Sequence, residues 1–165
     1  MAPNLVTTLP ASAQRFTEAA RDLGLQIEPR EFPEGTRTAE DAARAIGVEV
    51  GQIVKSLVFL ASGAAILCLV SGANRLDKAR LTKAAGGARI TRADADAVRD
   101  TTGYAIGGVP PFAHVRNLTT YCDPDLLQYD IVWAAAGTPS TVFPIAPQKL
   151  VEITDARVVD LKESL

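Results

Sequence analysis

One lysine interrupts an apolar run that has the composition of a buried strand. From Ile53 to Leu60 every residue except Lys55 and Ser56 is apolar, and strand alternation places Lys55 on the same face as Phe59. Burying an ammonium group costs several kcal/mol unless the group is paired or its pKa falls. Lys55 is therefore a candidate catalytic residue. A lysine near a strand end that extends its amine to water is the alternative, and the strand alone leaves both open.

A glycine- and proline-rich segment from Gly103 to Pro111 is the second feature with chemical potential. It reads Gly-Tyr-Ala-Ile-Gly-Gly-Val-Pro-Pro, a composition that excludes a helix and a central strand. Glycines let backbone N–H groups approach a ligand closely, and such donors can stabilise charge that develops on a carbonyl oxygen. A plain tight connection is the alternative. The candidate binding residues here are Gly107, Gly108, Val109, Pro110 and Pro111.

Two further positions follow this segment. His114 is the one histidine of the chain and could act as a base, but no acidic partner is nearby in sequence, which favours a surface or loop histidine without a catalytic role. Gly137-Thr138-Pro139-Ser140 predicts a compact turn between two strands, and Gly137, Thr138 and Ser140 are candidate binding residues. Ser140 lacks the nucleophile-elbow pattern, so the chain is not predicted to be a serine hydrolase.

A basic cluster surrounds one predicted helix. Its members, Arg75, Lys78, Arg80 and Lys83, form either a solvated helix face or a minor phosphate contact. The whole chain has a net charge of −2 and a pI of about 5.4, which argues against DNA or any long nucleic-acid backbone as partner. Binding the end of a nucleic acid through a few residues remains compatible with this charge.

The length of 165 residues predicts one domain, residues 1–165, with a core over about 12–161. Cys68 and Cys122 lie in separate apolar runs, which indicates buried thiols rather than a metal site. No phosphate-binding glycine motif follows a strand, so we expect no cofactor and no metal. Met1 to Pro10 lacks the pattern of a signal peptide, and no apolar run is long enough to span a bilayer. We therefore expect a soluble cytoplasmic protein with no membrane partner.

Periodicity and caps predict an α+β fold: a mixed, mostly antiparallel sheet curled toward a barrel, with helices packed outside. Ser12 is expected to cap the first helix, Thr38 the second, Asp77 the third and Thr91 the fourth. The predicted helices span about 12–23, 38–46, 77–85, 91–101 and 147–153, and the predicted strands 26–32, 53–60, 64–70, 88–90, 118–122, 131–136, 140–145 and 158–159.

Several motifs together resemble the YbaK/EbsC family, which is similar to the editing domain of prolyl-tRNA synthetase and to the free-standing ProXp aminoacyl-tRNA deacylases. The motifs occur in the family's order over about 12–161: Ile53-Val-Lys55-Ser-Leu-Val-Phe, Ser71-Gly through Leu76-Asp77 and Leu81, Thr102-Gly-Tyr104, and Gly107-Gly-Val-Pro-Pro111. Each motif is weak alone, whereas their order and spacing make the resemblance fairly specific.

The resemblance implies a trans-editing hydrolase that removes a mischarged alanine, cysteine, serine or threonine from tRNA, commonly tRNA-Pro. Lys55 matches the family's strand lysine, and Gly107 to Pro111 match its loop; in the family these elements flank the aminoacyl ester and the terminal adenosine. The implied partners are the aminoacyl-tRNA acceptor end and a synthetase that recruits the enzyme. In this interpretation Lys55 acts as a cation that positions substrate, with a neutral general base as the alternative.

Two positions depart from the family pattern. Ser56 stands where the alanine-specific branch carries asparagine, and the turn from Gly137 to Ser140 lacks a histidine that several relatives carry. His114 is a possible substitute for that histidine. A non-catalytic module that binds an aminoacyl or nucleotide end, and a small-molecule esterase, are the competing interpretations.

Overall fold

Five α-helices appear in the computed structural model, which describes residues 9–32, 36 and 38–164. Thr38 caps α2, its side chain accepting the Asp41 N–H, and Asp77 caps α3 by accepting from Ala79 and Arg80. Most of the first ten residues, on which the signal-peptide prediction rests, lie outside the described ranges. The helices are α1 (Ala11–Asp22), α2 (Ala39–Ile46), α3 (Lys78–Ala84), α4 (Ala95–Thr102) and α5 (Pro147–Thr154), with 3₁₀ turns η3 (Val50–Gln52) and η4 (Pro124–Gln128).

Two predicted helix starts were wrong. α1 begins after Pro10, and Ser12 lies inside the helix without capping it, because the proline already fixes the extended backbone before the first turn. α4 is capped by Asp94, whose side chain accepts the Ala97 N–H, whereas Thr91 belongs to a strand. In both cases the predicted cap, Ser12 or Thr91, lies within a few positions of the observed one.

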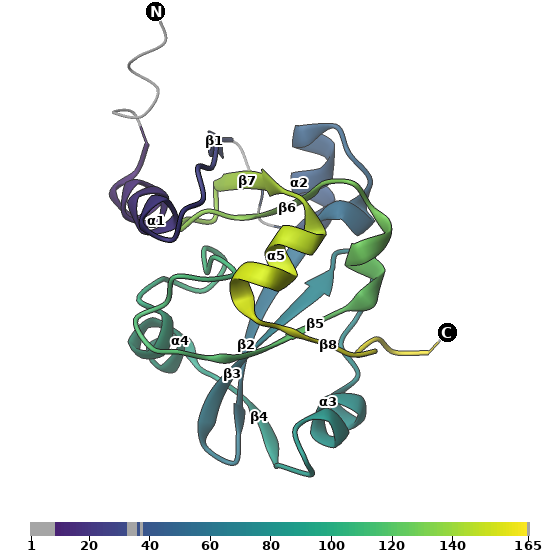
Figure 1. Cartoon of the computed structure of the whole chain (residues 1–165). Coiled ribbons are helices and arrows are strands. Elements are labelled where there is room, and N and C mark those ends of the chain that lie inside the picture. Colours follow the sequence, from purple (N-terminus) through teal and green to yellow (C-terminus); the bar gives the residue numbers. More distant parts are fainter. Residues whose placement is uncertain (1–8, 33–35, 37, 165) are drawn as a thin grey trace, which may run out of the picture.

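The eight strands of the described ranges form two sheets (Figure 1). The smaller sheet has the order β1-β7-β6, and the larger has the order β4-β2-β3-β5-β8. The pairs β3–β5 and β5–β8 are parallel and the other pairs are antiparallel. The strands are β1 (Arg30–Glu31), β2 (Val54–Ala61), β3 (Ala64–Ser71), β4 (Ile90–Arg92), β5 (Thr119–Cys122), β6 (Val132–Ala135), β7 (Thr141–Ile145) and β8 (Arg157–Val158).

This architecture confirms the predicted mixed α+β fold with helices around the sheets (Figure 1). Over the described ranges the two sheets stay separate and do not close into a barrel. The predicted strand 26–32 shrinks to the two exposed residues of β1. Within those same ranges, none of the helices combines the length and apolarity that crossing a bilayer requires.

The two faces of the β2–β3 hairpin pack into different apolar cores. The register pairs Val58 with Leu67 and Phe59 with Ile66, so alternate pairs face opposite sides of the sheet. One face belongs to the α1–α5 core, which includes Phe16, Val54, Leu67, Leu69, Val109, Phe112, Phe143 and Leu150. The other belongs to the α3 core, which includes Ile66, Cys68, Val70, Leu81, Tyr121 and Leu161.

Both cysteines are buried free thiols in strands, as predicted. Burial raises the pKa of Cys68 to about 12. Burial, together with the negative charge of Asp123, raises the pKa of Cys122 to about 12 as well. Both side chains are therefore thiols near neutral pH, with the nucleophilicity of the thiolate suppressed.

Candidate functional site

Lys55 is the second residue of β2 and is half-buried. Its ammonium group donates a hydrogen bond to the backbone carbonyl of Asn74, in the turn that follows β3. Burial lowers the pKa of Lys55, the nearby charges of Glu40 and Asp123 raise it, and that of Arg75 lowers it. The ammonium is thus held at the strand end by a neutral acceptor, and no carboxylate of the described residues forms a direct ion pair with it.

The strand that carries Lys55 has an open stretch along one edge. On one side β3 accompanies β2 along its whole length. On the other side β4 pairs only with Phe59 to Ala61, and an isolated parallel bridge joins Ile53 to Trp133 of β6. Among the described residues, no strand pairs with this edge between the bridge and β4. Backbone donors and acceptors on this stretch therefore lack a strand partner.

The alternation of hydrogen bonds shows which backbone groups face the open edge. Gly72 N–H donates to Ile53 O at 2.7 Å on the β3 side, and Ser62 N–H donates to Arg89 O at 2.8 Å on the β4 side. In an antiparallel ladder the groups of successive residues alternate between the two edges. The backbone N–H and C=O of Ser56 therefore point to the open edge.

Lys55 and Ser56 point to opposite faces of the sheet. Ser56 pairs with Leu69 of the α1–α5 core, whereas Lys55 pairs with Val70 of the α3 core. The glycine loop contributes Val109 to the α1–α5 core, so the side chain of Ser56, rather than that of Lys55, shares the face of this loop. The Ser56 hydroxyl is buried and has no hydrogen-bond partner among the described residues.

The glycine loop and the turn between β6 and β7, which the sequence places 30 residues apart, lie against each other. A Cβ atom added at Gly108 would lie 2.7 Å from Thr138 Cα, and one added at Gly107 would lie 3.5 Å from Pro139 Cγ. Only glycine permits this approach at position 108, because 2.7 Å is well inside van der Waals contact. These two predicted binding segments therefore form one surface.

Hydrogen bonds inside the turn hold its shape. Thr138 Oγ1 lies 2.7 Å from Thr141 Oγ1 and 3.4 Å from Ser140 Oγ, and it accepts the Ser140 N–H at 3.3 Å. Gly137 has φ of +108°, and a Cβ there would lie 2.6 Å from Ser12 O of α1. Ser140 is thus part of the turn's internal hydrogen bonding.

His114 braces the glycine loop. Its Nε2 lies 2.6 Å from the Pro110 carbonyl oxygen, so the neutral ring donates when it carries its proton on Nε2. Burial lowers the pKa of His114, and the hydrogen bond to Pro110 opposes that shift. Val109, Pro110 and Pro111 are buried, Gly107 is exposed, and Gly108 N–H already donates to Ala105 O at 2.9 Å. Among the described residues, the loop N–H groups without an acceptor are therefore those of Gly107 and Val109.

The predicted basic cluster is divided by its contacts. Arg80 forms an ion pair with Asp160 and donates to Ser164 Oγ, so its charge is directed to the C-terminal segment. Arg75 lies near enough to Lys55 to lower the pKa of that lysine. Lys78 is exposed on α3. Lys83 is exposed as well, and neither lysine has an ion pair among the described residues. Arg75 is therefore the cluster member with a shown influence on Lys55.

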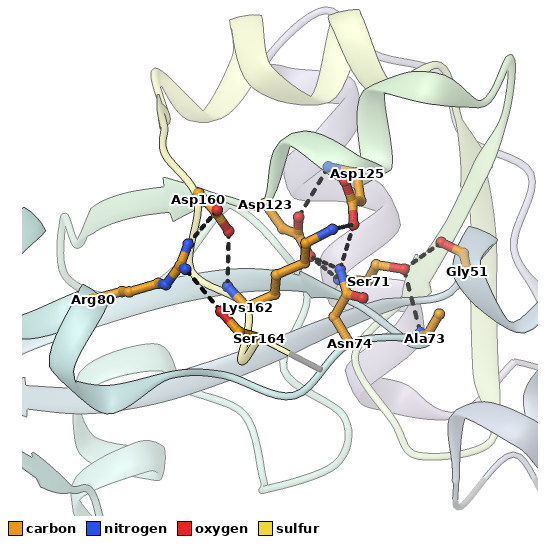
Figure 2. A network of polar contacts seen from close by, with 10 residues as sticks. All are labelled: Gly51, Ser71, Ala73, Asn74, Arg80, Asp123, Asp125, Asp160, Lys162 and Ser164. Carbon is orange, nitrogen blue, oxygen red and sulfur yellow. Dashed lines mark hydrogen bonds and ion pairs between the residues drawn. The ribbon is translucent and has the colours of Figure 1, made fainter.

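Three residues absent from the sequence prediction belong to the surroundings of Lys55. Asn74 supplies the carbonyl that Lys55 contacts, and its side chain donates to Asp123 and Asp125 at 2.8 Å each (Figure 2). Asn74 lies in the motif between Ser71 and Leu76, which was a weak signal for it. The sequence prediction gave Asp123 no role, and its complete burial in the structure is what distinguishes it.

Within the ranges that the structure describes, no three side chains of histidine, cysteine, aspartate or glutamate gather as a metal site would require. A separate surface hollow is lined by Gln26, Ile27, Glu28 and Pro144 and includes none of the residues discussed above.

The family model for the aminoacyl-tRNA editing domain matches residues 33–153, which include β2, the Asn74 turn, the glycine loop and the β6–β7 turn. The chain belongs to the aminoacyl-tRNA editing domain family. The predicted resemblance is thereby confirmed, and so is the class of enzyme, an aminoacyl-tRNA deacylase that hydrolyses an ester bond.

Individual relatives of this editing domain agree with the family. A solved structure described as a candidate trans-editing enzyme for prolyl tRNA synthetase is 48% identical, with a TM-score of 0.91, over 95% of this chain and 100% of that one. The candidate Cys-tRNA(Pro)/Cys-tRNA(Cys) deacylase EbsC of Enterococcus faecalis is 26% identical over 75% of this chain and 76% of EbsC. Proline–tRNA ligase of Pelotomaculum thermopropionicum is 28% identical over 71% of this chain and 20% of the ligase.

Proposed function

We propose that this editing domain acts in trans on tRNA-Pro that carries a wrong small amino acid, namely alanine, cysteine, serine or threonine. The observation that carries the proposal is the ammonium of Lys55, held by the Asn74 carbonyl beside the open edge of β2. The relatives support the choice of tRNA, because the structure with 48% identity is described as a candidate trans-editing enzyme for prolyl tRNA synthetase and the description of EbsC names Cys-tRNA(Pro) beside Cys-tRNA(Cys).

The chemistry needs positioning more than a strong nucleophile. The ester is already activated, so orientation of water and stabilisation of the oxyanion supply much of the rate. Water, or a hydroxyl or thiol of the amino acid, attacks the carbonyl carbon; the bond to the ribose oxygen then breaks, and that oxygen takes a proton. In this scheme the charged ammonium of Lys55 holds the terminal phosphate or the ester.

We assign the other predicted site residues to substrate binding. The N–H groups of Gly107 and Val109 are the loop donors available to the developing oxyanion, since Gly108 N–H is used within the loop. We assign Ser56, whose buried hydroxyl lacks a partner among the described residues, to the contact with the aminoacyl group. Pro110, Pro111, Gly137, Thr138 and Ser140 shape the loop and turn that face the substrate, and His114 holds the loop.

The charge of the chain sets how it meets tRNA. With a net charge of −2, the protein lacks the positive face that would grip a long phosphate backbone. We therefore propose that it contacts only the acceptor end in the cytoplasm and that a synthetase recruits it, which raises the effective concentration of the substrate.

The test is hydrolysis of alanyl-, cysteinyl-, seryl- and threonyl-tRNA-Pro by the wild type, Lys55→Ala and Lys78→Ala. Lys78 is the matched control, because it is an exposed lysine of the nearby helix α3. We expect Lys55→Ala to lower kcat/KM about 100-fold, as the loss of one charge-stabilising group in a site typically does. Lys78→Ala should keep most of the activity.

Two outcomes would count against the proposal. Folded wild-type protein that hydrolyses none of the four esters would leave the non-catalytic binding module as the better interpretation. Equal turnover by Lys55→Ala and the wild type would remove Lys55 from the site. A pH–rate profile with a lysine-like ionisation between about 6 and 9 would favour the neutral-base role over the cation.

A further inference from the structure

We propose that Asp123 is a positioning residue for Lys55 and that it acts through Asn74. The inference rests on the proposed function for its catalytic consequence, and it concerns residues that never touch the substrate. Asp123 follows β5, Asn74 follows β3 and Lys55 is the second residue of β2, so the chain of contacts links three neighbouring strands at one end of the sheet.

Asp123 is fully buried, and its carboxylate is surrounded by donors. Oδ2 accepts the Ser71 N–H at 3.1 Å and the Asn74 side-chain amide at 2.8 Å, and Oδ1 accepts the Asp125 N–H at 2.9 Å (Figure 2). A buried carboxylate is costly unless it is hydrogen-bonded in this way. Capping η4 requires only the hydrogen bond from the Asp125 N–H, which a neutral side chain could also accept. The other two bonds, from Ser71 and Asn74 in the turn after β3, therefore indicate a second role for Asp123.

Those two bonds fix the turn that presents a carbonyl to Lys55. The Asp123 carboxylate accepts hydrogen bonds from Ser71 at the start of the turn and from Asn74 at its end. Within the turn, Asn74 N–H donates to Ser71 O at 3.0 Å. The Asn74 carbonyl oxygen then accepts the hydrogen bond from the Lys55 ammonium. The side chain of Asn74 faces Asp123 while its backbone faces Lys55, so one residue transmits the position of the carboxylate to the lysine.

A second carboxylate keeps the Asn74 side chain from turning away. Asp125 Oδ2 accepts from the Asn74 amide at 2.8 Å and from Lys162 Nζ at 2.9 Å. Figure 2 shows Asp123 and Asp125 on either side of the Asn74 amide, with Lys162 reaching Asp125 from the C-terminal segment. Both amide hydrogens of Asn74 therefore have acceptors, which leaves its side chain a single orientation.

The charge of Asp123 also acts on Lys55. Burial lowers the pKa of Lys55, the charge of Arg75 lowers it further, and the charges of Glu40 and Asp123 raise it. Removing the Asp123 charge should therefore lower the pKa of Lys55 further. Glu40 and Arg75 would remain in place, so the change can be attributed to Asp123.

The experiment compares Asp123→Asn and Asn74→Ala with Asp160→Asn. Asp160 pairs with Arg80 in the C-terminal segment and accepts the Lys162 backbone N–H, but it contacts neither Asn74 nor Lys55. Asp160→Asn therefore controls for the loss of a nearby carboxylate charge that does not hold the Asn74 turn. Deacylation is measured alongside an NMR titration of the Lys55 side chain. We expect both test variants to lower kcat/KM about 10-fold, since small misplacements of reacting groups have effects of this order. Asp123→Asn should also lower the pKa of Lys55, and Asp160→Asn should change neither quantity.

A double-mutant cycle separates positioning from folding. If Asn74 acts through Lys55, then Asn74→Ala should change the residual activity of Lys55→Ala less than about two-fold, whereas a general structural defect would lower both backgrounds equally. Should Asp123→Asn not fold, Asn74→Ala and this cycle decide the matter. Wild-type activity in folded Asn74→Ala, or additive losses in the cycle, would overturn the inference.

The NMR titration does not depend on the substrate. Wild-type protein without activity on any of the four esters would refute the proposed function, yet a lower pKa of Lys55 in Asp123→Asn would still support the link between these residues. An unchanged pKa of Lys55 in folded Asp123→Asn would refute the link even if the wild type deacylates tRNA.

Discussion

The Lys55 site and the glycine-loop site are built by opposite means. The Lys55 site, made of Lys55, Asn74 and Asp123, is held by charged and polar side chains whose hydrogen bonds cross three strands. The glycine-loop site is made of Gly107, Gly108 and the turn at Thr138 and Pro139. It depends on close packing between these two segments, which is possible because glycine has no side chain.

This difference predicts how each site responds to change. Polar contacts at the Lys55 site set the charge and direction of one ammonium group, so substitutions there should alter rate and pKa more than the fold. Close packing at the glycine-loop site sets the distance between two segments, and a well-packed junction cannot accept an added atom without moving its backbone. Substitutions there should alter stability and activity together.

The largest effect on this comparison is expected from Gly108→Ala. The new Cβ would lie 2.7 Å from Thr138 Cα, so the loop and the turn must separate. We expect a loss of about 1–3 kcal/mol in the free energy of unfolding, measured with urea, because overpacking costs that much. Deacylation should fall about 10-fold or more, since the loop donors move with the backbone.

Gly63→Ala is the matched control for Gly108→Ala. Gly63 has φ of +89° in the β2–β3 hairpin and no atom within 4 Å of an added Cβ. Alanine there should cost roughly 1–2 kcal/mol from the left-handed backbone alone. The two variants would then have similar stability, and activity retained by Gly63→Ala but lost by Gly108→Ala would assign the loss to the junction. Equal activity of both would show that the junction is not needed.

Local sequence patterns predicted the secondary-structure elements far better than the contacts between residues that are distant in the sequence. The two strands predicted at 53–60 and 64–70 and the caps at Thr38 and Asp77 depend on residues a few positions apart, and the structure confirms them. The contact between Asn74 and Asp123 joins residues 49 positions apart, and it exists because β3 and β5 are parallel neighbours. No local pattern contains that pairing.

The sequence also could not predict on which face of β2, relative to the Lys55 side chain, the glycine loop lies. Alternation correctly placed Lys55 and Ser56 on different faces of β2, but it cannot say which face the loop covers. That choice depends on the loop packing into the α1–α5 core through Val109 and Phe112. It makes Ser56 the side chain of β2 that shares a face with the loop.

Ser56→Ala is expected to have an intermediate effect, with stability and activity moving in opposite directions. The Ser56 hydroxyl is buried without a partner among the described residues, and an unsatisfied buried hydroxyl costs about 1–3 kcal/mol. Alanine should therefore raise the free energy of unfolding by about 1 kcal/mol while lowering kcat/KM for the preferred ester. Ser56→Thr, which retains the hydroxyl, is the control. A stabilised variant with unchanged kcat/KM for all four esters would mean that Ser56 does not contact substrate.

The smallest effect is expected from His114→Gln, and it should depend on pH. Burial lowers the pKa of His114 in the folded state, so between that lowered pKa and the usual value of about 6.5 the unfolded chain binds the proton more readily. Wild-type stability should therefore fall as the pH decreases below about 6.5. Glutamine can still donate to the Pro110 carbonyl but does not titrate, so urea unfolding of this variant should lose less stability over the same range.

Activity of the same variant decides what His114 does for the loop. If it only holds Pro110, His114→Gln should keep kcat near the wild-type value at neutral pH, where the wild-type ring is already neutral, and His114→Ala should destabilise the loop. A kcat lowered as strongly in His114→Gln as in His114→Ala would instead mean that the ring takes part in proton transfer. The glycine-loop site would then contribute a titrating group of its own, and the contrast with the Lys55 site would be one of position and not of chemistry.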